Sequence, residues 1–449
     1  MKFLCEKENL NTETIKSFLQ KFSQYESPRL IKYKRYYDGK HDILNKVNED
    51  DSKPCNKIVN NFCSQIVDNY LGYLVGKDVT YTSTQDITAI SEVLAYNDSR
   101  TADSELLRQA LIYGRAFEVC YVDEEAKQRF KVLDAAETFA IYDNTLDENL
   151  LAAVRFYPVD AFDSGKGFYV DVYTDVNIDH YKAENGFTTL QALDSEPHYY
   201  GQVPVTVFSL NQEEVSVFEK ILTLQDTYNT ILSTATDDYE AFSNYYMVIK
   251  SHTEVDTDKL INIKINRVAS LDPEDSIEFI TPAQIATDTS VRLKDIDEQI
   301  HKISNSPDFS DDAFGTSSGI AMGYKLLGFE NTAGAIAANM TKALQKRLEL
   351  ICAILKMVNG DAIWRDIEIT FTRNLPFDYA SMAQLITQLK GTVSDRTLLS
   401  LLPFVSDIDK ELEMVKETKL ENQEIYGFGE NNNLGNEDKA DEEDSKATS

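Results

Sequence analysis

The chain has 449 residues, with 44 lysines and arginines against 75 aspartates and glutamates and a formal net charge of −31. A protein that grips nucleic-acid phosphates needs a basic face, so this balance argues against a tight DNA binder. At 42% hydrophobic residues the chain can fill at least one sizeable core. No apolar run reaches 18 residues, so no membrane span is expected.

The N-terminal residues and the cysteines indicate the compartment. Residues 1–10 are charged and lack the apolar core of a secretory signal. The 5 cysteines are odd in number and widely scattered, without a C-x-x-C pair. These features argue against a disulfide framework or a cysteine zinc site and favour a reducing cytosol.

The first half of the chain is predicted to form helices and then a sheet. Residues 1–110 are predicted to be helical, most strongly where Ile58, Phe62, Ile66, Tyr70 and Leu74 recur every fourth residue. Alternating or continuous apolar runs then predict strands at 116–123, 129–134, 152–157, 168–174 and 203–208, with a hairpin turn at Asn185-Gly186.

Three long helices are predicted in the second half. In the first, apolar residues recur every three or four positions from Val217 to Tyr246. A compact insert with strands at 247–250, 267–270 and 277–280 separates it from the second helix, 282–304, which a capping box opens at Thr281, Pro282 and Gln284. The third helix has its apolar stripe at 329–358, and we expect the first and third stripes to exceed what one subunit can bury.

Loops and shorter elements complete the prediction. Residues 306–318 have no periodicity and many loop-forming residues, so they are predicted to be a loop. A strand at 367–373 and helices at 378–424 follow. The tail, 430–449, carries seven acidic residues, two lysines and no aromatic residue, and is predicted to be disordered.

No catalytic motif in the sequence has the neighbouring residues that its chemistry requires. Residues 315–319 match the G-x-S-x-G pattern of serine hydrolases, but no buried strand precedes them and no histidine follows His301. A P-loop is absent from the sequence. The histidines lack metal-ligand spacing, and Asp308, Asp311 and Asp312 lack the glycine and glutamate of a calcium loop. We therefore expect no enzyme activity, no metal and no cofactor.

The sequence resembles the portal proteins of tailed double-stranded DNA bacteriophages, in particular those of siphoviruses that infect Gram-positive hosts. The stretches that carry this resemblance are YYDGKHDI (36–43), KIVNNFCSQIVDNYLGYLVGKDVTY (57–81), IYGRAFEVCYVD (112–123), FAIYDNTLDENLLAAVRFY (139–157), HYYGQVPVTVF (198–208), SPDFSDDAFGTSSGIAMGYKLLGFEN (306–331) and LKGTVSDRTLLSLLPFVSD (389–407). Each stretch alone is weakly specific, but the seven in this order make the match specific.

The resemblance implies an α+β, mainly helical fold assembled into a ring of about twelve subunits at one capsid vertex. The implied parts are a wing (1–212), stem helix 1 (213–246), a clip (247–281), stem helix 2 (282–305), a tunnel loop (306–318), a long wing helix with a return strand (319–376), crown helices (377–428) and a disordered acidic tail (429–449). The ring would conduct the genome during packaging, retention and ejection. The protein would belong to the virion and reside in the host cytoplasm during assembly.

The resemblance also implies partners and contact residues. The partners are other copies of the chain, double-stranded DNA, the terminase packaging motor, a head-completion adaptor, and the major capsid and scaffolding proteins. The tunnel-loop residues expected at the DNA are Asp308, Phe309, Asp311, Asp312, Phe314 and Ser317.

Basic residues of the second long helix are further candidates for DNA contact. Arg292, Lys294 and Lys302 would face the DNA, unless they pair with Asp295, Asp297 or Glu298 along the helix. Two other functions stay open at this point. One is a non-conducting head–tail adaptor or scaffold-binding ring, and the other is a nucleic-acid enzyme, which the missing P-loop and metal-ligand spacing oppose.

Overall fold

The computed structural model describes residues 2–48, 53–160, 164–184, 186–243, 246–250, 276–280, 285–309, 319–359, 364–374, 379–402, 405 and 408–426. The chain divides into two compact units, Met1–Asn374 and Leu375–Ser449. The fold is mixed α+β and about half helical, less helical than the sequence predicted.

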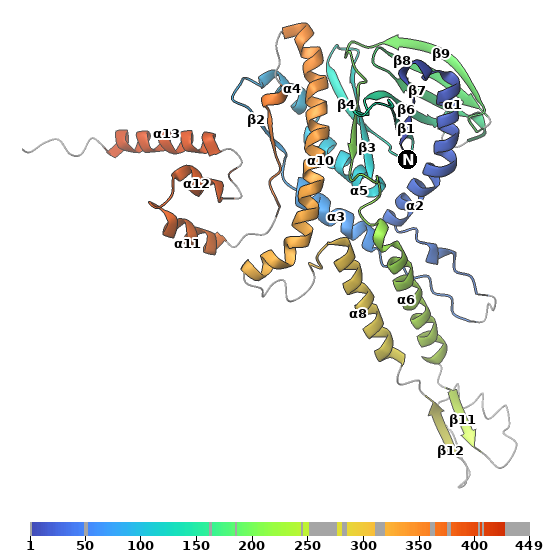
Figure 1. The fold of residues 1–449 in the computed structure, drawn as a ribbon. Coiled ribbons are helices and arrows are strands. Elements are labelled where there is room, and N and C mark those ends of the chain that lie inside the picture. Colours follow the sequence, from blue (N-terminus) through green and yellow to red (C-terminus); the bar gives the residue numbers. More distant parts are fainter. Residues whose placement is uncertain are drawn as a thin grey trace, which may run out of the picture. The chain divides into compact units, whose positions relative to one another are not determined.

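In the described N-terminal residues, five α-helices precede most strands of the two sheets (Figure 1). The helices are α1 (Thr12–Lys21), α2 (Ser27–Tyr37), α3 (Phe62–Val75), α4 (Thr88–Tyr96) and α5 (Ser99–Tyr113). Helix α3 begins where the Asn61 side chain accepts a hydrogen bond from the Ser64 N–H, and its apolar repeat is buried as predicted.

A six-stranded sheet has the order β1-β5-β6-β7-β8-β9, and a three-stranded sheet has the order β10-β3-β4. The strands are β1 (Phe3–Leu4), β3 (Arg115–Val122), β4 (Gln128–Leu133), β5 (Thr138–Tyr142), β6 (Leu150–Pro158), β7 (Phe168–Tyr173), β8 (Asn177–Glu184), β9 (Thr189–Pro197) and β10 (Val205–Ser209). Strand β1 pairs in parallel with β5, a pairing that its two-residue length hides from sequence patterns. Gly186, between β8 and β9, has a φ of 65°, as the predicted hairpin turn requires.

Gly114 sets the junction between α5 and β3. Its φ of 82° is a left-handed conformation, and its N–H closes α5 by donating to the Ala110 carbonyl at 2.7 Å. A Cβ at this position would lie 2.4 Å from the backbone carbonyl carbon of Glu214. Only glycine fits, so this turn brings β3 against the segment that leads into the next helix.

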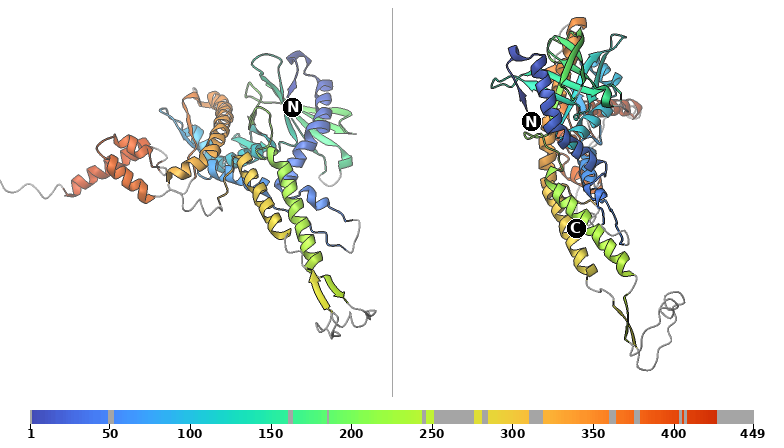
Figure 2. Two further views of the ribbon diagram at one scale, coloured as in Figure 1. Left: turned by 60° about the horizontal axis from the view of Figure 1, so that its bottom comes forward. Right: turned by 90° about the vertical axis from the view of Figure 1, so that its right-hand side faces the viewer.

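Two helices lie side by side and are joined through a hairpin (Figures 1 and 2). Helix α6 (Leu222–Ser243) follows a 3-10 turn, Glu219–Ile221, and α8 is Ile285–Ser304. Between them β11 (Tyr246–Lys250) pairs antiparallel with β12 (Ser276–Ile280). The predicted strand at 267–270 and the predicted capping residues Thr281, Pro282 and Gln284 lie outside the described residues.

Helix α10 (Gly319–Asn359) packs against the sheets and the N-terminal helices. Beyond it, β13 (Glu368–Thr370) pairs with β2 (Thr80–Thr82). The α10 apolar stripe is buried within this one chain; its buried members include Phe329, Ile336, Met340, Leu344 and Leu348. The expectation that this stripe needs a neighbouring subunit to cover it is therefore wrong, because the three-stranded sheet and helices α3 and α4 already cover it.

A buried charge cluster joins α10 to α5 and β3. The Arg347 guanidinium is fully buried and donates to both carboxylate oxygens of Glu118, at 2.7 and 2.6 Å. It also pairs with Asp103, whose second oxygen accepts from the Tyr81 hydroxyl at 3.3 Å. The bidentate geometry and added hydrogen bonds are what a buried arginine requires, so the cluster fixes how α10 sits on β3.

Within its described residues, the second unit contains the helices α11 (Tyr379–Leu389), α12 (Asp395–Ser400) and α13 (Ile408–Tyr426). Ser394 caps α12 by accepting from the Thr397 N–H, and Arg396 pairs with Asp409 of α13 at 3.1 Å. The predicted disordered tail, 430–449, lies outside the described residues. Among the helices described, none combines the length and apolarity that a bilayer span needs.

Candidate functional site: the paired helices and the segments packed on them

The most buried face of α6 is polar. Gln225, Asn229 and Ser233, one helical turn apart, are all 0% exposed. The apolar stripe that the sequence predicts for this helix lies on other faces and is only half buried, and Tyr239 within it is 76% exposed. Sequence reasoning missed the polar face because it reads polar residues on a helix as solvent-facing.

An extended segment, residues 53–61, runs along this polar face into Phe62, the first residue of α3, and we call residues 53–62 the strap. Alternate backbone N–H groups of the strap donate to side chains one turn apart on α6: Phe62 to Gln225 Oε1 at 3.0 Å, Asn60 to Asn229 Oδ1 at 3.0 Å, Ile58 to Ser233 Oγ at 3.0 Å, and Asn56 to Asp237 Oδ1 at 2.6 Å. Two extended residues span about 6.6 Å and four helical residues about 6.0 Å, so the two repeats match. We call these four hydrogen bonds the ladder. The ladder fixes the position of α6 along the strap.

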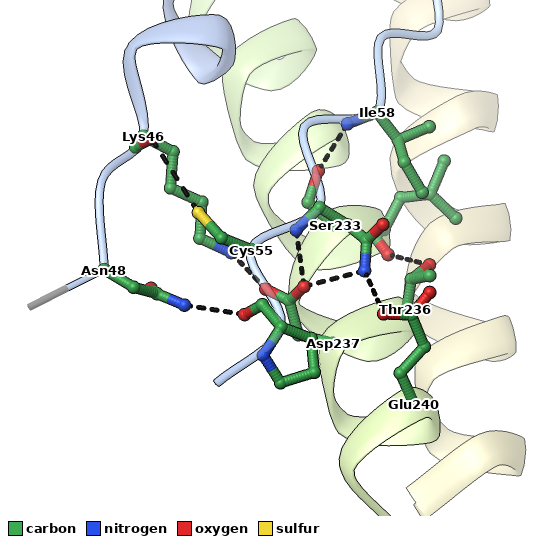
Figure 3. A network of polar contacts seen from close by, with 11 residues as sticks. Lys46, Asn48, Cys55, Ile58, Ser233, Thr236, Asp237 and Glu240 are labelled. Carbon is green, nitrogen blue, oxygen red and sulfur yellow. Dashed lines mark hydrogen bonds and ion pairs between the residues drawn. The ribbon is translucent and has the colours of Figure 1, made fainter. Parts of the chain in front are cut away.

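The end of the ladder at Asp237 carries charged side chains (Figure 3). Asp237 accepts from Lys46 Nζ at 2.6 Å and from the Asn56 side-chain amide at 2.9 Å. Partial burial opposes ionisation, but these donors hold the pKa of Asp237 below its usual value. The same Asn56 amide reaches Glu240 at 3.0 Å, and Asn48 donates to the Pro54 carbonyl at 2.6 Å.

A buried histidine, His41, joins the ladder at Asn229. The Asn229 amide donates to His41 Nδ1 at 2.8 Å, and His41 Nε2–H donates to the Tyr36 carbonyl at 2.9 Å. Burial lowers the pKa of His41, so the ring is held neutral with its proton on Nε2. Tyr36 in turn donates its hydroxyl to Asp226 at 2.7 Å, so α2, the strap and α6 form one connected polar core.

The basic residues of α8 lie in solvent. Arg292 Nε is 3.3 Å from Asp288 Oδ2, and Lys294 Nζ is 4.0 Å from Glu298 Oε1, with both cationic side chains at least 67% exposed. Lys302 is exposed as well. Pairing along the helix therefore occurs, with Glu298 as predicted and with Asp288 in place of Asp295 or Asp297. Their contact with DNA stays a prediction.

The start of the predicted tunnel loop is held in place. Ser306 is fully buried, and its hydroxyl accepts from the Asn69 amide of α3 at 3.0 Å. Phe309 is 44% exposed and packs edge-on against Phe329 of α10, with ring centroids 6.2 Å apart. Phe309 therefore anchors the start of this loop on α10. The remaining predicted residues, Asp311, Asp312, Phe314 and Ser317, lie outside the described residues.

The C-terminal end of α8 brings together three potential metal ligands. Asp297, His301 and Asp308 each offer a ligand atom, and these atoms all lie within 4.8 Å of one another. His301 Nδ1–H donates to the Ser306 carbonyl at 2.8 Å, and Nε2 lies 3.7 Å from Asp297 Oδ1. Burial first and then the nearby Asp308 carboxylate raise the pKa of Asp297. The Asp297–His301 spacing of four was the only sequence signal for this cluster, since Asp308 joins it through the turn after α8.

Large apolar side chains on these elements are exposed in the single chain. They are Tyr239 of α6 (76%), Val291 and Ile303 of α8 (53% and 42%), and Tyr324 and Leu327 near the start of α10 (76% and 55%). Scattered exposed apolar residues are ordinary, and among the described side chains these five are the candidates on these elements for burial against another chain.

Comparison with known proteins identifies relatives of the chain. The family model described as phage portal protein, SPP1 Gp6-like, matches residues 17–425. A portal protein of Clostridium phage phiCD119 is 24% identical over 431 residues, covering 87% of this chain and 92% of the relative. The portal protein of Bacillus phage SPP1 is 24% identical over 328 residues, covering 68% of this chain and 65% of its own length.

Two solved structures of gene transfer agent particles also align with the chain. A chain from the neck of the native particle, computed with C12 symmetry, aligns with a TM-score of 0.43 and 10% identity, covering 76% of this chain and 89% of its own. A chain from the virion of the native particle aligns with a TM-score of 0.44 and 10% identity, covering 83% of this chain and 92% of its own.

Proposed function

Because this chain belongs to the family of SPP1 Gp6-like phage portal proteins, we propose that about twelve copies form a closed ring at one capsid vertex. The ring encloses the channel through which double-stranded DNA is packaged, retained and ejected. The protein is a structural component of the virion. The family match over residues 17–425 supports a conducting ring over a non-conducting adaptor.

The observation that carries the ring is the uncovered apolar surface of α6, α8 and the start of α10. Its residues are on neighbouring elements and are 42–76% exposed in one chain. Contact between different faces of successive copies closes into a ring when the rotation between copies allows it. Such a contact buries this surface without any further component.

Each part of the chain has a place in this proposal. Residues 1–212 form the wing, 213–246 and 282–305 the two stem helices, 247–281 the clip, 306–318 the tunnel loop, 319–376 the long wing helix and return strand, 377–428 the crown, and 429–449 the tail. Helices α6 and α8 then surround the DNA. The ladder along the strap braces α6 against the wing.

The charge of the chain suits a conduit. At −31 per copy, twelve copies carry roughly −370, a potential that opposes firm adhesion of DNA. Low adhesion allows movement, because each retained phosphate contact would slow translocation. Arg292, Lys294 and Lys302, together with the tunnel-loop residues, supply brief contacts within this repulsive field.

The proposed partners follow from where the parts lie in the chain. The β11–β12 hairpin connects the two stem helices at their far ends. The clip that contains it is therefore available to the terminase motor during filling and to the head-completion adaptor afterwards. Capsid and scaffolding proteins would contact the wing during assembly in the host cytoplasm.

Ring assembly is tested by light scattering and by electron micrographs of the purified full-length chain. We expect closed rings with a central bore, and we expect Tyr239→Glu to shift the population strongly toward the 50.9 kDa monomer. Tyr199→Glu is the matched control, because Tyr199 is 68% exposed but lies beyond β9, away from the paired helices in the chain. A wild-type protein that stays monomeric at micromolar concentration in several salts would contradict the proposal.

A further inference from the structure

We propose that Asp297, His301 and Asp308 form a binding site for one zinc-class divalent cation at the junction between α8 and the segment that follows it. Their ligand atoms lie within 4.8 Å of one another without any ion present. One imidazole nitrogen and two carboxylates are a common protein ligand set for Zn²⁺ with an open position for water. Both carboxylates contribute oxygen ligands, and the imidazole contributes one nitrogen.

The histidine is oriented as a ligand rather than as a surface residue. The His301 side chain is only 11% exposed. Its Nδ1–H donates to the Ser306 carbonyl at 2.8 Å, so the neutral ring keeps the lone pair on Nε2, the nitrogen nearer Asp297. Metal-binding histidines characteristically donate their other N–H to a carbonyl or carboxylate in this way. The Phe62 ring packs edge-on against the imidazole at 6.0 Å and fixes its plane.

The distances need little adjustment to accept zinc. Ligand atoms about 2.0–2.1 Å from a tetrahedral zinc ion are roughly 3.3 Å apart. His301 Nε2 and Asp297 Oδ1 are 3.7 Å apart and sit on successive turns of one helix. Asp308 comes from the turn beyond α8, which Ser306 and its bond from Asn69 hold in place. All three ligand atoms lie within 4.8 Å of one another, and rotation of the two carboxylates about their side-chain bonds brings their oxygens toward one ion.

The mixed donor set also selects among cations. Magnesium and calcium prefer shells made of oxygen, whereas imidazole favours zinc and its neighbours in the transition series. A bound ion would tie Asp308 to α8. In the ring proposed above, this is the point where the stem helix passes into the tunnel loop. Ion binding itself requires only one folded chain.

Zinc binding is measured by calorimetric titration of the full-length chain after removal of metals with a chelator. We expect one Zn²⁺ per chain at this site, with Mg²⁺ and Ca²⁺ binding far more weakly. His301→Gln and Asp308→Asn should each weaken Zn²⁺ binding by at least about tenfold. Loss of a group that only supports a metal ligand already lowers metal affinity by about this factor, so loss of a ligand should cost at least as much. Asp295→Asn is the control, since Asp295 is exposed on the same helix two residues from Asp297.

Co²⁺ absorption and the Asp308→Asn variant distinguish loss of a metal ligand from loss of folding. Co²⁺ in place of Zn²⁺ should give a visible absorption band in the wild type and in Asp295→Asn, and the band should be lost in Asp308→Asn. Asp308 lies outside any helix or strand, so its substitution decides the question even if His301→Gln does not fold. Equal Zn²⁺ affinity in wild type and Asp308→Asn, or an equal loss in Asp295→Asn, would overturn the site. Neither result depends on whether rings form.

Discussion

Helices α6 and α8 lie side by side, yet they are held by opposite kinds of contact. Helix α6 buries a row of polar side chains against the backbone of the strap, with Gln225, Asn229 and Ser233 fully buried. Helix α8 has one fully buried apolar residue, Ile300, among its described side chains, and its charges pair in solvent.

The difference shows what each kind of contact specifies. Apolar contacts are non-directional, so along most of its length they do not fix the position of α8 along its axis. Directional bonds act at its C-terminal end, where the Ser304 carbonyl accepts from the Tyr70 hydroxyl at 3.1 Å. A buried N–H that loses its acceptor costs the full desolvation of that group, so a sliding α6 would lose several bonds at once. The ladder therefore fixes α6 over several turns, whereas the directional bonds of α8 lie at its C-terminal end.

Removing the centre of the ladder should have the largest effect. Asn229→Ala takes away the acceptor of the Asn60 N–H, the partner of the Gln225 amide and the donor to His41. Because these groups are buried, we expect a loss of about 2–4 kcal/mol in the free energy of unfolding. Thermal and denaturant unfolding at one fixed protomer concentration measure it, since assembly shifts the apparent stability.

The neighbouring residue offers a control for that substitution. Thr230 is exposed, and its hydroxyl donates within α6 to the Asp226 carbonyl at 2.8 Å. Thr230→Ala should change stability by less than about 0.5 kcal/mol. If Asn229→Ala were no worse than Thr230→Ala, the ladder would not be what fixes α6.

The charged end of the ladder should matter less and should depend on pH. Asp237 is 14% exposed, and Asp237→Asn removes its charge-assisted bond from Lys46, so we expect a loss of about 1–2 kcal/mol at pH 7. Its pKa is lowered in the folded chain, so the unfolded chain binds the proton more readily and stability rises with pH.

The lowered pKa of Asp237 determines the pH range over which its charge stabilises the fold. The contribution of the Asp237 charge is present above the unfolded pKa of about 3.9 and is lost as pH falls through the lower folded value. The gap between wild type and Asp237→Asn in urea unfolding should therefore shrink between pH 7 and pH 3. A gap that widens on acidification would contradict the assigned ionisation of Asp237.

The elements of the fold were largely predictable from the sequence, because apolar periodicity reports burial directly. The helix over Ile66 and Tyr70, the hairpin between the long helices and the strands β3, β4, β6, β7 and β10 follow from it, whereas β1, β5, β8 and β9 were not predicted. The ladder was not predictable, because its N–H donors belong to an extended segment with no periodic pattern of its own. The α10 stripe was predicted correctly as a helix face but assigned to the wrong partner, since sequence alone does not show which sheet will cover it.

The candidate site was predictable only in part. The resemblance selected Phe309 and Asp308, which the structure places against Phe329 and beside His301 respectively. The metal-ligand cluster was missed because its third member comes from beyond the helix, and the distance between a helix residue and a following turn is set by tertiary contacts. The buried Ser306, held from α3, is the contact that brings Asp308 back.

The exposed charges of α8 should have the smallest effect on stability and thereby complete the contrast with α6. Arg292 and Lys294 are 67% and 77% exposed, so their pairs with Asp288 and Glu298 are screened by water and salt. The double substitution Arg292→Gln and Lys294→Gln should leave the free energy of unfolding within about 1 kcal/mol of wild type, and rings should still form. If these cations meet DNA in the channel, the substituted rings should bind short duplex DNA more weakly, with a shallower dependence of log affinity on log salt concentration. Lys302→Gln, tested alone, shows whether the third exposed cation of α8 contributes in the same way. An unchanged salt dependence would remove Arg292 and Lys294 from the channel surface, and a large loss of stability would show that α8 is held by its charges after all.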